Sequence, residues 1–239
     1  MTIGCAVLAR ECYYCAAISK NIIDLRILEQ GLHDVGEEKM SSSLQREIDA
    51  IDPEKYEAIL LAYGLCNHGI RNLHAKIPLV VPRAHDCITL LMGSKEAYMT
   101  YFHDNPGCFF RSVGWAERAH DNLSNPESTT RQMGMGTYEE YVEKYGEENA
   151  KYLMETLGDH LRNYSRLTYI DTNLPLDEKY QKEAMDIAKE KAWTFSEVKG
   201  NTRLILDLMN GAWDNSDFLV VEPGKTIQTS YDEDIIKTT

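Results

Sequence analysis

Side chains that bind soft metals and transfer protons are concentrated in one stretch of this chain, residues 63–115. Three of the six cysteines and four of the seven histidines lie in it, namely Cys66, Cys87, Cys108, His68, His74, His85 and His103. Thiolate and imidazole are ligands for metal ions and groups for acid–base chemistry. Their density predicts that the chemistry of this protein is carried by this stretch.

Two short apolar runs precede these residues, at 58–62 and 77–81. Their length and β-branched content are typical of buried strands. Cys66 follows the first run, and the triplet His85-Asp86-Cys87 follows the second. Because ligands bind at the carboxyl ends of strands in open α/β sheets, we expect these residues to be neighbours on two adjacent strand ends.

Metal binding is the chemistry that these residue types favour most. The predicted ligands are Cys66, Cys87 and His85, with Cys5 from the first predicted strand as a fourth. Such ligands suit zinc, nickel or cobalt, or an iron–sulfur cluster. The spacing differs from that of a zinc ribbon or a ferredoxin. The cysteines could instead be small hydrophobic residues at strand ends, and both interpretations stay open.

Acid–base catalysis is a second interpretation, in which His85 is a general base and Asp86 orients it. Adjacent residues on an extended strand point to opposite faces, so this pairing requires a turn. Cys87 as a nucleophile at a helix N-terminus ranks below metal ligation, because no oxyanion hole can be identified. Arg83 is predicted to bind an anionic cofactor group, and Trp115 a flat apolar one.

A separate C-x-x-C pair, Cys12 and Cys15, follows the first predicted strand. Such a pair can be a redox or metal half-site. It can equally be two small residues on a helix, and an isolated pair favours that simpler interpretation.

The alternation of apolar runs and amphipathic segments predicts an α/β protein with a Rossmann-like, mostly parallel sheet and a helical insertion. Residues 1–115 should form an N-terminal α/β half that carries the site, and 116–165 the helical insertion or cap. Residues 166–239 should complete the sheet and end in a short tail of about fifteen residues. The first strand is expected over residues 2–9.

Composition excludes several classes of function. The net charge of -13 repels a phosphate backbone, which argues against nucleic acid as a partner. No apolar run approaches the roughly 20 residues that span a bilayer, and the N-terminus lacks the basic and apolar segments of a signal peptide. We therefore expect a cytoplasmic protein without a membrane partner, whose cysteines are thiols or ligands.

Four motifs identify a resemblance. They are Y-G-L-C-x-x-G, P-R-x-H-D-C-I-x-L-L-x-G-S, P-G-x-x-x-x-x-x-G-W, and W-D-x-x-D-F-L-V-V-x-P-G, the last from Trp213 to Gly224. Together they resemble the uncharacterised family catalogued as domain of unknown function 1638, across nearly the whole chain. The family occurs in methanogenic archaea and anaerobic bacteria, often beside corrinoid methyltransferase components.

The resemblance implies a role in anaerobic one-carbon metabolism, as a metal- or iron–sulfur-dependent enzyme or an accessory protein. Corrinoid or methyltransferase proteins would be its partners, and His85 could give a corrinoid its lower axial nitrogen. The D-x-H-x-x-G string of the usual corrinoid-binding domain is absent, which favours a metal bound directly by the protein. The alternative is a non-catalytic protein that docks on a methyltransferase through its acidic helical surface.

Overall fold

The computed structural model describes residues 1–29, 37–66, 68–118, 138–151, 164–175 and 177–239. Its main sheet has five strands in the order β2-β1-β3-β4-β8. These are β2 (Leu25–Leu28), β1 (Thr2–Cys5), β3 (Ile59–Ala62), β4 (Leu79–Pro82) and β8 (Phe218–Val221). The first four run parallel, and β8 is antiparallel to β4. The predicted α/β fold with a mostly parallel sheet is confirmed.

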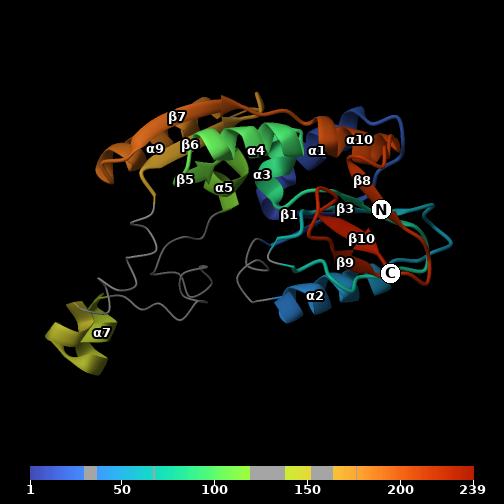
Figure 1. Cartoon of the computed structure of the whole chain (residues 1–239), viewed down its shortest axis with the longest axis horizontal. Helices are drawn as coiled ribbons and strands as arrows, with labels where there is room; N and C mark the ends of the chain where they lie inside the picture. Colours follow the sequence, from blue (N-terminus) through green and yellow to red (C-terminus); the bar gives the residue numbers. More distant parts are fainter. Residues whose placement is uncertain (30–36, 67, 119–137, 152–163, 176) are drawn as a thin grey trace.

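Helices cover both faces of this sheet. Helix α1 (Ala9–Ile18) contacts α10 (Arg203–Asn210), and both lie on the side opposite α2 (Glu37–Asp49) in Figure 1. The apolar side chains of α2, Met40, Leu44 and Ile48, recur every four residues and are buried against the sheet. Within the part of the chain that the structure describes, no helix is both long and apolar enough to span a bilayer.

A second sheet of three parallel strands has the order β5-β6-β7. Its strands are β5 (Cys108–Arg111), β6 (Arg166–Asp171) and β7 (Thr194–Lys199), packed against α9 (Asp177–Glu190). This arrangement differs from the prediction that residues 166–239 complete the main sheet. Strands β6 and β7 pair with β5 and share a small core with α9, so only β8 joins the main sheet.

Two helices connect β4 to β5, and a third follows β5. They are α3 (Cys87–Met92), α4 (Lys95–Asp104) and α5 (Val113–Arg118). Gly93, between α3 and α4, has a positive φ of 77°, and the Ser94 hydroxyl accepts a hydrogen bond from the backbone of Ala97. Gly93 therefore ends α3, and Ser94 caps the start of α4.

The first strand is shorter than predicted. Strand β1 ends at Cys5, and the chain continues as a 3-10 turn, η1 (Ala6–Leu8), directly into α1. Every residue from Thr2 to Ala9 is buried. A run that is apolar on all sides has no period that separates strand from helix, which explains the wrong boundary.

The C-terminal residues are not a tail, and this prediction is wrong. They form an antiparallel hairpin of β9 (Ile227–Thr229) and β10 (Ile236–Thr238). Three isoleucines of the hairpin, Ile227, Ile235 and Ile236, are buried in the main core. Main-chain hydrogen bonds of 2.8 and 3.1 Å also join Ile227 to Asn72 and Leu73.

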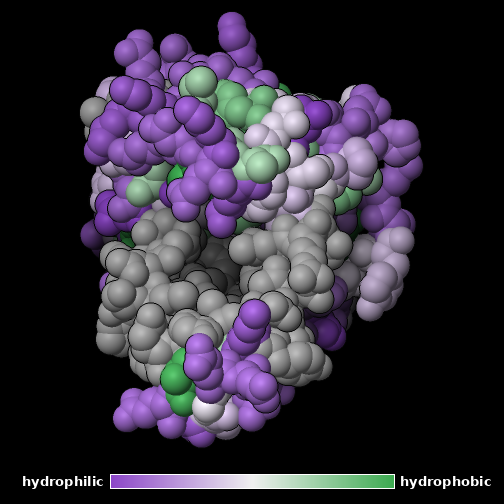
Figure 2. Space-filling model, turned by 90° about the vertical axis from the view of Figure 1, so that its left-hand side faces the viewer, coloured by the Kyte–Doolittle hydropathy of each residue, from purple (hydrophilic) through white to green (hydrophobic). Residues whose placement is uncertain are grey.

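The predicted insertion at 116–165 lies mostly outside the described residues, so its boundaries stay a prediction. Its described part contains the end of α5 and the helix α7 (Tyr138–Tyr145). Figure 2 views the molecule from the side on which β7, α9 and α7 lie in Figure 1. The coloured surface there is mostly hydrophilic, with small hydrophobic patches.

The loops that follow β3 and β4 are in direct main-chain contact. The backbone N–H of Leu65 donates to the carbonyl of Ala84 at 2.8 Å, and that of Cys66 to the carbonyl of His85 at 2.9 Å. A Cβ atom on Gly64 would lie 2.6 Å from both N and Cα of Asp86. Only glycine allows this approach, and it brings the two loops together.

We expect Gly64→Ala to lower the free energy of unfolding by about 3 kcal/mol, the upper end of the overpacking range, because the methyl group meets backbone that cannot rotate away. Gly211→Ala is the matched control. Gly211 has a φ of 76° but no close neighbour, so backbone strain alone costs about 1–2 kcal/mol there. Urea unfolding measures both variants. Equal losses would show that the contact at Gly64 does not constrain the loops.

Candidate functional site

A cavity of about 710 Å³ lies at the carboxyl ends of β3 and β4. One wall is formed by the two loops that follow these strands, and the other by the turn between β9 and β10. The lining residues are Leu65, Cys66, His68, His85, Asp86, Cys87, Thr229, Ser230, Tyr231 and Asp232. The stretch expected to carry the chemistry therefore contributes six of the ten residues.

The structure brings Cys66 and Cys87 together, as their positions at two adjacent strand ends predicted. The backbone N–H groups of Gly64 and Cys87 both donate hydrogen bonds to the sulfur of Cys66. Each cysteine is 7 % exposed, and each lines the cavity. Two thiols from different strands therefore reach the same small volume.

Cys5 lies behind this pair. It ends β1, which pairs with β3, and its thiol is close enough to act electrostatically on both Cys66 and Cys87. Cys5 is almost completely buried and does not line the cavity. Cys5, the predicted fourth ligand, is thus near Cys66 and Cys87 but is buried away from the cavity.

Burial raises the pKa of Cys66 and of Cys87 well above the usual range of a thiol. The carboxylate of Asp86, and the neighbouring cysteines when they are ionised, raise both pKa values further. Hydrogen bonds from backbone N–H groups lower both values in part. Both cysteines are therefore protonated near neutral pH. A nucleophile needs the thiolate, so this environment disfavours Cys87 as a nucleophile. A metal ion, by contrast, displaces the proton when it binds.

The two residues of the predicted catalytic pair, His85 and Asp86, have different surroundings. His85 is exposed and lines the cavity. Asp86 is the N-cap of α3, and its Oδ1 accepts hydrogen bonds from the backbone and hydroxyl of Thr89 at 3.1 and 3.3 Å. Its Oδ2 accepts one from the Tyr98 hydroxyl at 3.3 Å. Both carboxylate oxygens of Asp86 are thus hydrogen-bonded to residues of α3 and α4. General-base catalysis by His85 stays a prediction.

Arg83 and Trp115, predicted to bind a cofactor, do not line the cavity. The buried Arg83 guanidinium donates to the carbonyls of Asn215 at 2.8 Å and Asp234 at 3.0 Å, and also to that of Ile236. It therefore fastens the C-terminal hairpin, one wall of the cavity, to the end of β4. Trp115 is half-buried in α5 and packs on the main core. Arg83 therefore has a structural role, Trp115 is a packing residue, and cofactor binding by either stays a prediction.

Six lining residues were not among the predicted site residues: Leu65, His68, Thr229, Ser230, Tyr231 and Asp232. Nδ1 of His68 lies 3.0 Å from Thr229 Oγ1, which connects the loop after β3 to the hairpin. The close spacing of Cys66 and His68 was a signal for this histidine. The hairpin residues carried none, because nothing in their spacing places the chain terminus beside β3 and β4.

Cys12 and Cys15 belong to the main core. Both are completely buried in α1, and the Cys12 sulfur packs on Gly4. Cys15 donates to the carbonyl of Thr202 at a sulfur–oxygen distance of 3.8 Å. Neither residue lines the cavity, and these contacts favour the interpretation as small packed residues.

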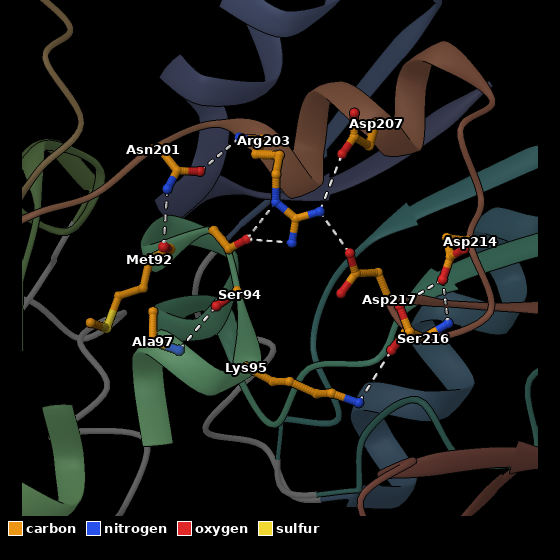
Figure 3. A network of polar contacts seen from close by, with 11 residues as sticks. Met92, Ser94, Lys95, Ala97, Asn201, Arg203, Asp207, Asp214, Ser216 and Asp217 are labelled. Atoms are coloured by element: carbon orange, nitrogen blue, oxygen red, sulfur yellow. Dashed lines mark hydrogen bonds and ion pairs between the residues drawn. The ribbon is translucent and has the colours of Figure 1, made fainter. Parts of the chain in front are cut away.

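A polar network fixes the far end of α3, whose first residue is Cys87 (Figure 3). Arg203 donates to the carbonyl of Gly93 at 3.0 and 2.7 Å and pairs with Asp217 at 2.6 Å. Lys95 adds a hydrogen bond of 3.2 Å to the carbonyl of Ser216. With Asp86 as the cap at its start, α3 is held at both ends, and so is the position of Cys87.

The donor types suit a soft metal, since two thiols and two imidazoles line one cavity. Within the described ranges, however, no three His, Cys, Asp or Glu side chains are arranged to hold an ion. The residue types therefore suit a metal, and metal binding by Cys66 and Cys87 stays a prediction. A third ligand requires His68 or His85 to turn inward, or has to come from the bound molecule.

Comparison with known proteins gives a family but no function. The family model described as "Protein of unknown function (DUF1638)" matches residues 27–209. No curated protein and no solved structure matches the chain. The matched segment contains Cys66, His85 and Cys87, whereas the hairpin lies beyond it. Because the match covers well over half of the 239 residues, the chain belongs to the DUF1638 family.

Proposed function

We propose that this protein is a metal- or iron–sulfur-dependent enzyme or accessory protein of anaerobic one-carbon metabolism, with Cys66 and Cys87 as its sulfur ligands. The observation that carries the proposal is the convergence of these two thiols, from two adjacent strands, on one cavity. The connection to corrinoid-dependent methyl transfer depends on the family resemblance.

Each lining residue has a distinct role in this proposal. Cys66 and Cys87 bind the metal, and the imidazole of His85 or His68 completes the site from the open side. Cys5 lies behind the pair and is available to a cluster that needs a third sulfur. The bound metal would act as a Lewis acid or carry electrons, depending on its identity. The protein itself holds the ligands and controls access through the hairpin.

The size of the cavity suggests how a methyl carrier would reach it. About 710 Å³ is the volume of a small-molecule site. We therefore expect a corrinoid to be presented at the mouth by a partner protein, where His85 is exposed, instead of being enclosed. We also propose a cytoplasmic location, where cysteines stay reduced.

The alternative function is a non-catalytic docking partner of a methyltransferase. Its support is the net charge of -13 and the hydrophilic surface in Figure 2 that includes α7. A docking protein needs no bound metal, so metal content separates the two functions.

The first test is metal content after strictly anaerobic purification. We expect Cys66→Ser and Cys87→Ser each to lower occupancy roughly tenfold or more, because a protonated hydroxyl replaces a soft thiolate ligand. Cobalt(II) titration should show sulfur-to-metal charge-transfer absorption in the wild type and not in these variants. Cys108→Ser and the double variant of Cys12 and Cys15 are controls and should keep full occupancy. A wild type without metal would favour the docking function.

The imidazole ligand can be identified with the same cobalt absorption. Replacing the coordinating histidine by Gln should weaken binding about tenfold, because the amide is a poor substitute for the imidazole. We expect this for His85→Gln, with His68→Gln and the exposed His103→Gln for comparison. If only His68→Gln weakens binding, His85 is not a ligand. If neither change does, the third ligand is not an imidazole of this cavity.

Thiol reactivity tests the raised pKa values directly. We expect iodoacetamide to modify Cys66 and Cys87 slowly at pH 7. The rate should rise about tenfold per pH unit toward alkaline pH, because the thiolate fraction grows as pH approaches the raised pKa. Mass spectrometry of the labelled peptides gives the rate at each site. Rapid modification of Cys87 at neutral pH would instead support its interpretation as a nucleophile.

A further inference from the structure

A second cavity of about 710 Å³ lies apart from the cysteine cavity and shares no residue with it. It is bounded by the start of α1, the end of α5 and the loop that follows β6. The proposed function makes no use of it.

The charge of this cavity is opposite to that of the chain. Its lining includes Arg10 and Arg118 against one carboxylate, Glu117. The cysteine cavity, by contrast, contains the carboxylates Asp86 and Asp232 and neither lysine nor arginine. In a protein with a net charge of -13, a cationic hollow is a local exception that attracts anions.

Three cations converge on the single carboxylate. Nε of Arg10 donates to Glu117 at 2.6 Å, and a second hydrogen bond from the same guanidinium completes the fork. These hydrogen bonds lower the pKa of Glu117, and the charges of Arg10, Arg118 and Lys179 contribute to the decrease. Glu117 pairs with Arg10, whereas Lys179 lies outside the cavity lining and pairs with Glu183 at 3.8 Å. Among the residues that line the cavity, Arg118 is therefore the cation that Glu117 leaves available to an anionic group from outside.

Aromatic rings form another part of the same wall. Tyr13 and Tyr14 project from α1 and are 58 % and 45 % exposed, and Tyr180 of α9 also lines the cavity. Large exposed rings beside a cavity present flat apolar faces together with hydroxyl groups. Such a wall stacks on a planar ring and can donate hydrogen bonds to its polar edge.

We propose that this cavity binds a small molecule that joins a planar ring to a phosphate or carboxylate, of about the size of a nucleoside monophosphate. Arg118 holds the anionic group, since a guanidinium fork matches the oxygens of either anion. Tyr13 and Tyr14 contact the ring. A concave site of this volume fits a small ligand better than a macromolecular surface does.

Calorimetric titration of the full chain with adenosine monophosphate tests the proposal. We expect binding about tenfold or more tighter than for adenosine or inorganic phosphate alone, because only the nucleotide contacts both the rings and the cations. Phenyl phosphate and benzoate distinguish the two anionic groups, and tighter binding of one identifies the preferred anion. If none of these compounds binds more tightly than inorganic phosphate alone, the proposal is wrong.

Charge variants give effects of opposite sign. Arg118→Gln should weaken binding about tenfold, because it removes a charge-assisted contact. Glu117→Gln should strengthen it, because the competing carboxylate is lost and Arg10 is released. Lys182→Gln, an exposed lysine on α9 outside the cavity lining, is the matched control and should change nothing. Circular dichroism confirms that each variant is folded.

Tyr13→Leu tests the ring contact and should weaken the nucleotide without affecting inorganic phosphate. If Arg118→Gln and Lys182→Gln weaken binding equally, the nucleotide senses only the net charge of the protein and the cavity is not its site. Loss of metal from the cysteine cavity should leave this binding unchanged, which keeps the two proposals separately testable.

Discussion

The close contact between the loops after β3 and β4 is the constraint on which the cysteine cavity depends. Gly64 lies against the backbone of Asp86 at a distance that no side chain permits, and the main chain at Leu65 and Cys66 continues to pair with the neighbouring loop. This pairing fixes the separation of the two loops. The sulfur of Cys66 then accepts a hydrogen bond from the N–H of Cys87, and both thiols line one cavity.

The same burial that positions the thiols also sets their chemistry. Removed from water and beside Asp86 and Cys5, both thiols keep their protons, and the N–H groups that point at Cys66 only partly offset this effect. A site of this kind is poorly suited to nucleophilic attack and well suited to a cation that replaces protons. The electrostatics and the softness of sulfur therefore both favour metal binding over nucleophilic catalysis.

The C-terminal hairpin adds a second wall to the cavity at the two strand ends. It is held by three kinds of interaction: buried isoleucines, main-chain pairing with the loop at 72–73, and the carbonyls that accept from Arg83. Arg83 belongs to the same loop as His85, so the wall and the candidate ligands are anchored to one segment.

The sequence by itself determined the α/β class, most of the parallel sheet and the meeting of Cys66 with Cys87. Apolar runs of strand length are a local pattern, and parallel strands share a carboxyl edge in every sheet of this class. Both can therefore be recognised in a single sequence. The end of β1 at Cys5 could not be predicted, because a run that is buried on every side shows no hydrophobic periodicity to separate strand from helix. Only the tertiary structure decided that β6 and β7 pair with β5, and that the last fifteen residues cover the site. These depend on contacts between segments up to about 150 residues apart, such as Arg83 with Ile236, for which local pattern carries no signal.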